Sequence, residues 1–280
     1  PQIPLLKTRP RSQQRQRPEY SQDFFQESPD GGSFFIQISF YIVHNLLYNI
    51  LIYDKEKIIM NNVWQVVVDS FPQLLSRGLL MTIPLTLISF AIALVIAVVV
   101  ALVQFARIPV LRQICRFYIW VIRGTPLLVQ LYVIFFGLPS IGVNIDAFPA
   151  AVLVFSINEG AYAAETIRGA LESVPSGQME AGRCVGMSYV QIMWHVLLPQ
   201  TFRTAFPALG NELISMVKDT SLAANITVTE MFFQAQRIAG RTYQTMALYL
   251  EVAVIYLIFS TVLSLLQRFG EKKLSVYGKR

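Results

Sequence analysis

"LLMTIPLTLISFAIALVIAVVVALV", residues 79–103, is a long apolar stretch that contains no charged side chain. Crossing the hydrocarbon core of a bilayer takes roughly 20 residues of α-helix, so the stretch is long enough to span a membrane. A segment of this kind indicates that the chain folds in a lipid bilayer. We therefore expect a transmembrane helix here.

The composition of the whole chain agrees with lipid as its solvent. Of its 280 residues, 54% are hydrophobic and only 14% are charged, whereas a soluble domain carries about 25% charged residues. The net charge of +6 would suit nucleic acid, but the basic residues lie at the ends of apolar runs and form no clear basic face. The composition indicates a membrane protein and argues against nucleic-acid binding.

Four further apolar segments follow the first. They are residues 115–137, 148–170, 201–219 and 245–266. The fourth span of the resulting five, 201–219, is the least hydrophobic, which is typical of a helix buried among its neighbours around a polar path. The predicted fold class is an all-α integral membrane protein with five transmembrane helices.

The second span contains a break. In "RGTP", residues 123–126, Thr125 can cap a helix and Pro126 suits the first turn of one. We therefore expect an interfacial helix followed by a spanning helix, with Arg123 snorkelling at the surface.

Lysine and arginine placement predicts the orientation. Basic residues gather between spans one and two, between spans three and four, and in the tail. They are Arg107, Arg112 and Arg116, then Arg168, Arg183 and Arg203, then Arg268, Lys272, Lys273, Lys279 and Arg280. The loop between spans two and three (LPSIGVNIDA) has none, and the loop between spans four and five has Arg237 and Arg241. The protein is thus expected in a cell membrane, with the N-terminus of 60–280 outside and the C-terminus in the cytoplasm.

The segments outside the spans divide as follows. Residues 1–59 are an atypical extension, rich in Pro, Gln and Arg over 1–33 and expected to be disordered there. Because Met60 is the first methionine and Lys55-Glu56 can be encoded by a ribosome-binding sequence, we hypothesise that natural translation starts at Met60. We expect residues 60–78 to be an amphipathic lead-in with a turn at Phe71-Pro72, 79–270 to be the transmembrane domain, and 271–280 to be a basic cytoplasmic tail.

A polar passage, "EAGRCVGMSYVQIMWHVLLPQ" (180–200), interrupts the apolar runs. One short helix can follow Pro175 and end at Gly186, and a second can run to Pro199, which would stop it. The loop, about 171–200, faces the cytoplasm in the predicted orientation. Two short helices lying across the membrane surface suit docking against a partner.

This passage resembles the EAA loop of ABC-importer permeases, which has Glu-Ala-Ala, a Gly six residues after the Glu, and Ile-x-Leu-Pro further on. The matching residues are Glu180, Ala181, Gly182, Gly186, Val196, Leu198 and Pro199. Gly182 replaces the second Ala and is expected to weaken the first short helix by up to about 1 kcal/mol. Val196 replaces Ile.

Four other segments resemble the polar amino-acid uptake branch of the same family. They are "RGTPLLVQL" (123–131), "EGAYAAETIRGALESVPSGQ" (159–178), "LPQTFRTAFPALGNELI" (198–214) and "KDTSL" (218–222). The resemblance extends over roughly residues 65–275. It implies the type I importer permease fold, a dimer of identical or related permease subunits, two cytoplasmic ATPases and an extracellular binding protein.

The resemblance also implies a role for the loop. A short helix would insert into a groove of the ATPase, so that nucleotide-driven closure rocks the spanning helices. The residues expected to couple are Glu180, Ala181, Gly182, Gly186, Met187 and Ser188. Independently, the chain has no G-x-x-x-x-G-K-[S/T] phosphate loop. We therefore expect no enzyme activity and no cofactor in this subunit, with ATP acting on its partner.

Ionisable residues inside spanning segments are costly and are candidates for a substrate path. Asn158 and Glu159 fall in the middle of span three, and Asn211 and Glu212 in the middle of span four. Glu159 can pair with the ammonium group of a substrate, or it can be a protonated or paired structural carboxylate. Glu165 and Arg168 are spaced for an intrahelical ion pair.

Other classes of function remain as alternatives. A standalone secondary transporter or channel would need no docking loop, and a membrane enzyme would need clustered catalytic groups. The two cysteines, Cys115 and Cys184, and the two histidines, His44 and His195, are isolated, so no catalytic or metal site is predicted. The transported amino acid stays open between a basic one, glutamine, histidine and cystine.

Overall fold

The computed structural model describes residues 57–276, and every regular element among them is a helix or helical turn. Almost all of the predicted extension, 1–59, lies outside the described residues, as do the last four residues of the predicted tail. The Met60 start and the disorder therefore stay predictions. The all-α class is confirmed for the described part.

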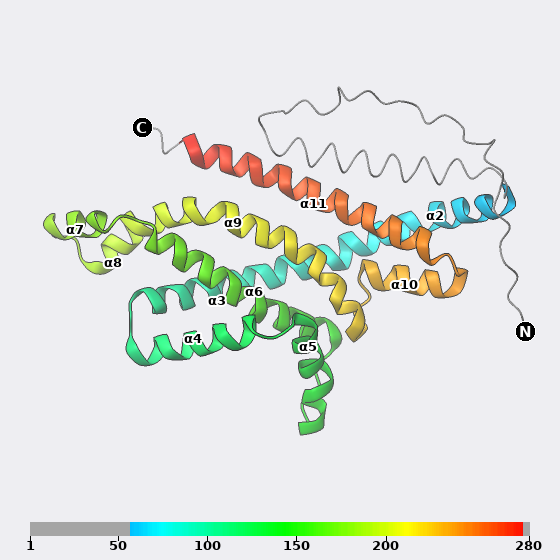
Figure 1. Ribbon diagram of the computed structural model, residues 1–280, viewed down its shortest axis with the longest axis horizontal. Helices are drawn as coiled ribbons and strands as arrows, with labels where there is room; N and C mark the ends of the chain where they lie inside the picture. Colours follow the sequence, from blue (N-terminus) through cyan, green and yellow to red (C-terminus); the bar gives the residue numbers. More distant parts are fainter. Residues whose placement is uncertain (1–56, 277–280) are drawn as a thin grey trace, which may run out of the picture. The chain divides into compact units, whose positions relative to one another are not determined.

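The chain runs through α2 (Lys57–Arg77), α3 (Ile83–Phe105), α4 (Pro109–Arg123), α5 (Leu127–Tyr132) and α6 (Ala147–Glu172). It continues through α7 (Ser176–Cys184), α8 (Tyr189–Ile192), α9 (Leu198–Asp219), α10 (Met231–Thr242) and α11 (Thr245–Val276). The helical turns η3 (Gly78–Thr82), η4 (Val133–Gly137), η5 (Leu138–Ile141), η6 (Met193–Leu197) and η7 (Thr220–Ile226) join several of them (Figure 1).

Three segments are long and apolar enough to cross a membrane: Val63–Phe105, Ala147–Glu172 and Thr245–Leu274. The pair Pro109–Arg123 and Leu127–Ile141 makes a fourth if it counts as one broken span. Helix α9 coincides with the predicted fourth span, but among the described helices it is not apolar enough to be counted. The predicted count of five spans stays a prediction.

The predicted turn at Phe71-Pro72 is wrong. Pro72 lies inside α2, and the helical path continues through the π-helical turn η3 into α3. Leu74, two residues after the proline, is fully buried against α10 and α11. Packing of this segment explains why it stays helical despite a residue that cannot donate a backbone hydrogen bond. The lead-in and the first span are therefore one helical segment.

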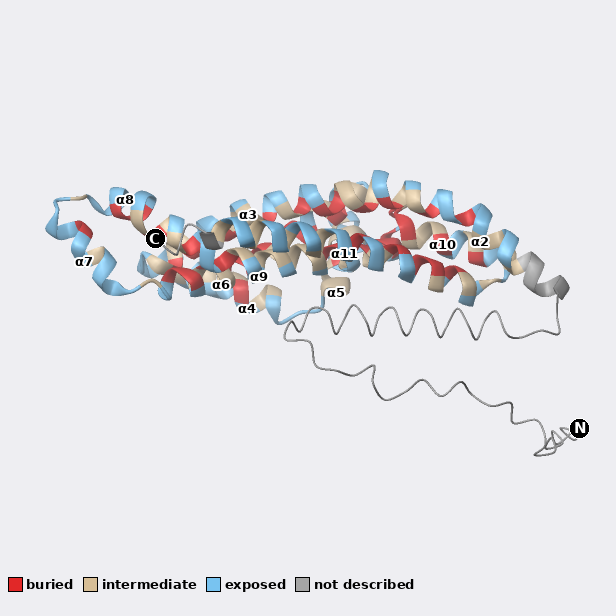
Figure 2. Ribbon diagram, turned by 90° about the horizontal axis from the view of Figure 1, so that it is seen from above, coloured by how far each residue is buried: buried red, intermediate tan, exposed pale blue. Residues whose placement is uncertain are grey.

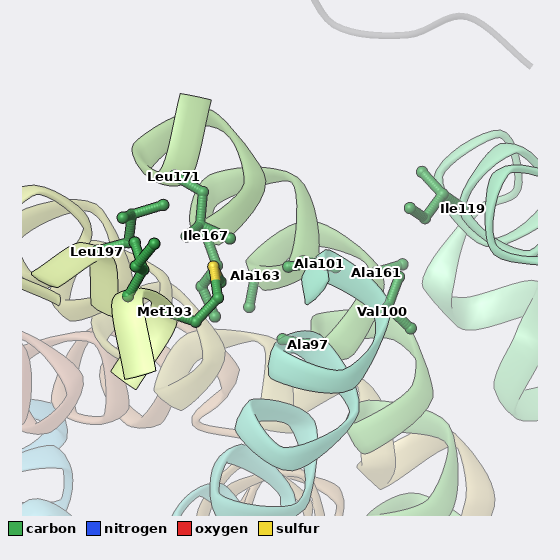
Figure 3. Close-up of a cluster of buried hydrophobic side chains, with 12 residues drawn as sticks. Ala97, Val100, Ala101, Ile119, Ala161, Ala163, Ile167, Leu171, Met193 and Leu197 are labelled. Carbon is green, nitrogen blue, oxygen red and sulfur yellow. The ribbon is translucent and has the colours of Figure 1, made fainter. Parts of the chain in front are cut away.

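Small residues bring α3 and α6 together at close range. The fully buried alanines at this contact include Ala93, Ala97 and Ala101 on α3 and Ala161, Ala163 and Ala164 on α6. The four-residue spacing on α3 lines them along one face, and Figure 3 shows Ala97, Ala101 and Ala163 gathered where the two helices meet. Such residues drive helix association in lipid because they let the backbones approach closely.

Buried side chains form three clusters along the bundle. One joins α3, α4 and α6 to η6, and a second joins α3, α5 and α6 to η7. The third joins α2 and α9 to α10 and α11. Figure 2 shows the buried residues on the inner sides of the long helices, while α7 and α8 at one end are largely exposed.

Gly160 provides a test of the contact between α3 and α6. A Cβ at this position would lie 2.9 Å from Cγ2 of Ile96 and 3.2 Å from the hydroxyl of Tyr118. Gly160→Ala should therefore lower the free energy of unfolding by about 1–3 kcal/mol through overpacking. The measurement is thermal unfolding in detergent.

Gly169→Ala is the matched control, because no atom lies within 4 Å of the added Cβ on the same helix. Its stability should be unchanged or raised, since Ala favours a helix by up to about 1 kcal/mol over Gly. Equal melting temperatures for the two variants would contradict the close approach of α3 and α6.

Candidate functional site

The polar loop forms a bent arm, which we call the elbow and define as residues 176–197. The predicted first helix is confirmed as α7, which follows Pro175. Gly186 then takes a left-handed conformation with φ of +79°, as its predicted place at a helix end requires. The amide of Met187 donates to the carbonyl of Gly182 at 3.0 Å, which closes the turn.

Pro199 does not stop the second helix, contrary to the prediction. Helix α8, the π-helical turn η6 and α9 are continuous, and Pro199 lies in the first turn of α9. The wider turn of η6 directly precedes the proline, so the ring fits where the regular hydrogen-bond ladder is already interrupted. The elbow therefore passes into α9 without a break.

The six predicted coupling residues have two kinds of structural role. Gly182 is buried, and a Cβ there would lie 2.7 Å from Cγ1 of Ile192, so its small size holds α7 against α8. Ser188 forms a capping box with Gln191 at the start of α8. Gly186 makes the turn between the helices, and Met187 beside it is half-buried. These four residues shape the elbow.

Glu180 and Ala181 are exposed on α7. Large apolar side chains are also exposed on the elbow: Val185 (76%), Val190 (73%) and Trp194 (70%). Exposed apolar residues that gather on one structural feature mark a contact surface more often than a solvated one. The elbow thus offers a carboxylate and an apolar surface together, and contact with an ATPase stays a prediction.

Two of the four predicted path residues lie on helices that pack against each other. Glu159 is on α6 and Glu212 is on α9. Thr166, two turns further along α6, donates from Oγ1 to Oε1 of Glu212 at 2.6 Å. Oε1 of Glu159 and Oε2 of Glu212 are buried and have no hydrogen-bond partner among the described residues.

The other two predicted path residues lie elsewhere. Asn158 is buried and its Nδ2 donates to Oε1 of Gln130 at 3.0 Å, towards the break in the second span. Asn211 is exposed on the side of α9 that faces α11, where its Oδ1 accepts from Gln267 at 3.2 Å. The structure therefore places Glu159 and Glu212 on two helices that pack together, whereas Asn158 and Asn211 bond to other parts of the bundle.

The predicted break at RGTP is confirmed, with the helices on its two sides meeting at 101°. Thr125, however, does not cap the second helix, because its hydroxyl donates back to the carbonyl of Val121 at 2.9 Å. Gln130 supplies the missing link: its Nε2 donates to the carbonyls of Ile122 (2.8 Å) and Thr125 (3.1 Å). One side chain thus joins both sides of the break to α6 through Asn158.

Arg123 is held against α6, and its snorkelling at the membrane surface stays a prediction. Its guanidinium lies 5.0 Å from the ring centroid of Tyr162 and 4.0 Å from Oε2 of Glu165, although 43% of the side chain stays exposed. The predicted intrahelical pair is confirmed, with Arg168 at 2.8 Å from Glu165. Arg168 also pairs with Glu172 at 2.7 Å.

Sequence reasoning missed Gln130, Thr166 and Glu230. Gln130 stands in the quoted "RGTPLLVQL", and Thr166 follows Glu159 by two helical turns, so both carried a visible pattern. Glu230 is fully buried, accepts from the amides of Phe232 and Phe233 as the cap of α10, and accepts from the hydroxyl of Tyr256. An acidic N-cap before apolar residues was its only signal.

A helical bundle with apolar spans, buried carboxylate oxygens on two packed helices and an exposed elbow is typical of a membrane transport subunit. Residues 93–276 match the family model described as "Binding-protein-dependent transport system inner membrane component". The chain belongs to this family, so the resemblance seen in the sequence and the permease fold are confirmed. It is accordingly a multi-pass membrane protein.

Individual proteins agree with the family. The chain is 46% identical over 215 residues to the L-cystine transport system permease protein TcyB of Bacillus subtilis, covering 76% of this chain and 92% of that one. It is 38% identical over 210 residues to the probable amino-acid ABC transporter permease protein YckA of the same organism, covering 75% and 92%. A crystal structure of an amino acid ABC transporter with histidines matches with a TM-score of 0.69 and 38% identity, over 74% of this chain and 96% of that one.

Gln130→Met tests the link across the break. Methionine keeps the length of the side chain but removes its hydrogen bonds and leaves buried Asn158 without its partner. Stability should fall by about 1–3 kcal/mol, measured by thermal unfolding, whereas Gln113→Met on the exposed side of α4 should be neutral. In the Gln130→Met/Asn158→Leu protein the two losses should be less than additive. Full additivity would mean that the two residues do not stabilise each other.

Proposed function

We propose that this chain is the permease subunit of an ATP-binding cassette importer that takes up a polar amino acid from an extracellular binding protein. The proposal is supported by the relatives, because one is named for L-cystine transport and one solved structure is titled as an amino acid ABC transporter with histidines. Polar amino acids of this range are the proposed substrate class, and cystine is its first candidate.

The observation that carries the proposal is that Glu159 on α6 and Glu212 on α9 each have one buried carboxylate oxygen. Every amino acid presents an ammonium group, and a carboxylate within a spanning segment is costly unless a cation or proton accompanies it. Oε1 of Glu159 and Oε2 of Glu212 have no hydrogen-bond partner among the described residues. They are therefore available to an incoming cation, and the ammonium group of the substrate fits this role.

The elbow is the proposed contact with the motor. Its exposed carboxylate, Glu180, and exposed apolar side chains would fit a groove on a cytoplasmic ATPase. Closure of two ATPases would then move the elbow as a rigid body and switch the bundle between inward- and outward-facing states. ATP would be hydrolysed by those partners, since this chain has no phosphate-binding loop.

The proposal includes an orientation and further partners. The elbow and the C-terminus face the cytoplasm, the start of the first span faces outward, and a second permease subunit completes the path. A standalone secondary transporter is the alternative. It would not need a protruding elbow with exposed Val185, Val190 and Trp194, and it would accumulate substrate without an ATPase.

Glu180→Lys tests the docking proposal. Reversing the charge of an exposed contact residue should weaken ATPase binding and reduce ATP-driven uptake by at least about tenfold. Uptake is measured in vesicles that contain the permease, its ATPase and the binding protein, and ATPase retention by co-purification. Gln178→Lys, exposed on the same helix, should insert and transport normally. Normal uptake and normal ATPase binding by Glu180→Lys would refute the coupling role.

Glu159→Gln tests the substrate path. The change removes the charge but keeps the shape, so uptake of cystine, histidine or arginine should fall by about tenfold or more while docking of the binding protein is retained. Asp146→Asn is the control, because Asp146 is exposed at the start of the same helix and its side chain makes no cap hydrogen bond. Unchanged uptake kinetics for all three amino acids would remove Glu159 from the path.

A further inference from the structure

A second polar feature lies at the end of α6 near the elbow, away from Glu159. It is a cleft of about 290 Å³ between α4, the end of α3 and α6, which is near the lower end of the roughly 300–1,000 Å³ typical of small-molecule sites. Its charged lining consists of Arg112 and Arg116 of α4 and of Glu165, Arg168 and Glu172 of α6. Trp120 of α4 closes one side of it. We call it the arginine cleft.

The two walls of the arginine cleft differ in how their charges are matched. On α6, Arg168 donates to both Glu165 and Glu172, and Gln104 of α3 donates to Glu165 at 3.2 Å. On α4, the side chains of Arg112 and Arg116 have no ion pair or hydrogen bond with any residue that the structure describes. The carboxylates of the cleft are thus already hydrogen-bonded to Arg168 and Gln104. The guanidinium groups of Arg112 and Arg116, one helical turn apart, are available to an anion.

The outer side of α4 is apolar next to these arginines. Val110 is 71% exposed, Phe117 64% and Trp120 72%, and the rings of Phe117 and Trp120 lie 5.9 Å apart. On a helical wheel these residues occupy the sector that adjoins the stripe of Arg112 and Arg116. A molecule that fills the cleft and also covers this sector needs an anionic head and an apolar tail.

We propose that the arginine cleft binds the headgroup of an anionic phospholipid, with the phosphate held by Arg112 and Arg116 and an acyl chain lying along Phe117 and Trp120. Arginine presents a planar fork of donors that matches phosphate oxygens, and basic pockets between membrane helices hold anionic headgroups. The bound lipid would support the cluster of Arg168 and Glu165 at the base of the elbow. A free inorganic phosphate offers the same anion without the tail.

Fluorescence of Trp120 in the full-length protein provides the test. The chain has three tryptophans, so the background Trp64→Phe/Trp194→Phe leaves Trp120 as the only reporter. This protein is reconstituted in bilayers that contain brominated phosphatidylglycerol or brominated phosphatidylcholine, and quenching gives the relative binding constant of the two lipids. Phosphatidylglycerol should bind about fivefold or more tightly, and Arg112→Gln/Arg116→Gln should bring the ratio close to one.

The control is Arg237→Gln/Arg241→Gln, which removes the same charge from two exposed arginines, also four residues apart, on α10. It should keep the lipid preference of the background protein. A ratio near one before any arginine is changed, or a ratio unaltered in Arg112→Gln/Arg116→Gln, overturns the proposal. Absence of quenching by either lipid would show that a second copy of the chain or another subunit covers Trp120, and would overturn it as well.

Two further arms separate the sources of the phosphate and extend the test to the assembled transporter. If inorganic phosphate at millimolar concentration abolishes the preference for phosphatidylglycerol, the cleft is a site for the free anion and the lipid assignment fails. Native mass spectrometry of the permease with its ATPase should show retained phosphatidylglycerol that is lost in Arg112→Gln/Arg116→Gln. These readouts do not depend on uptake, so they stand or fall separately from the proposed transport function.

Discussion

The close approach of α3 and α6 is the contact on which the rest of the bundle depends. Lipid provides no hydrophobic driving force between helices, so the two helices are held by dispersion contacts between small residues at short range. Ala161 and Ala164 form the face of α6 that packs against α3. This contact fixes the position of α6. The other faces of α6 present Glu159 beside α9, Asn158 to the broken span and Glu165 to the arginine cleft.

The connection between the carboxylates and the elbow follows from helical continuity. Glu159 lies on α6, which ends directly before the elbow, and Glu212 lies on α9, which continues from it through η6 without a break. Met193 and Leu197 of η6 pack against Ile167 and Leu171 of α6 (Figure 3). A displacement of the elbow would thus be transmitted along two rigid helices to both carboxylates. This geometry suits a lever, since packed helices move as bodies and do not deform continuously.

The helices could be predicted from the sequence because lipid imposes a simple rule, in which a long apolar segment must satisfy its backbone within itself. Predictions based on single residues were less successful. The sequence predicts a turn at Phe71-Pro72 and a helix end at Pro199, but both prolines lie in helical segments that packing or an adjacent π-helical turn keeps intact. Thr125 is predicted to cap the helix that follows it, but its hydroxyl donates to the carbonyl of Val121 in the preceding helix. At these three positions, packing or hydrogen bonding to a neighbouring helix or turn outweighs the local preference of the residue for a turn, a helix end or a cap.

The polar residues within the spans also differ in how far the sequence predicts their role. Glu159 and Glu212 could be selected because a carboxylate in an apolar helix is unusual wherever it points. The partners of Asn158 and Asn211 could not be selected, because an amide in a span can bond to any neighbour and only the helix packing decides which one. Gln130 was passed over for this reason, although it joins three parts of the fold.

The arginines illustrate what a positional rule leaves out. Counted along the chain, Arg112, Arg116 and Arg168 contribute equally to the predicted orientation, because that rule depends only on which loop a charge occupies. In the folded chain Arg168 is neutralised by two glutamates, whereas Arg112 and Arg116 meet no anion among the described residues. A guanidinium group near the headgroups that lacks a protein partner attracts the anions of the leaflet itself. The charges from which the orientation is predicted would then also bind lipid at the base of the elbow.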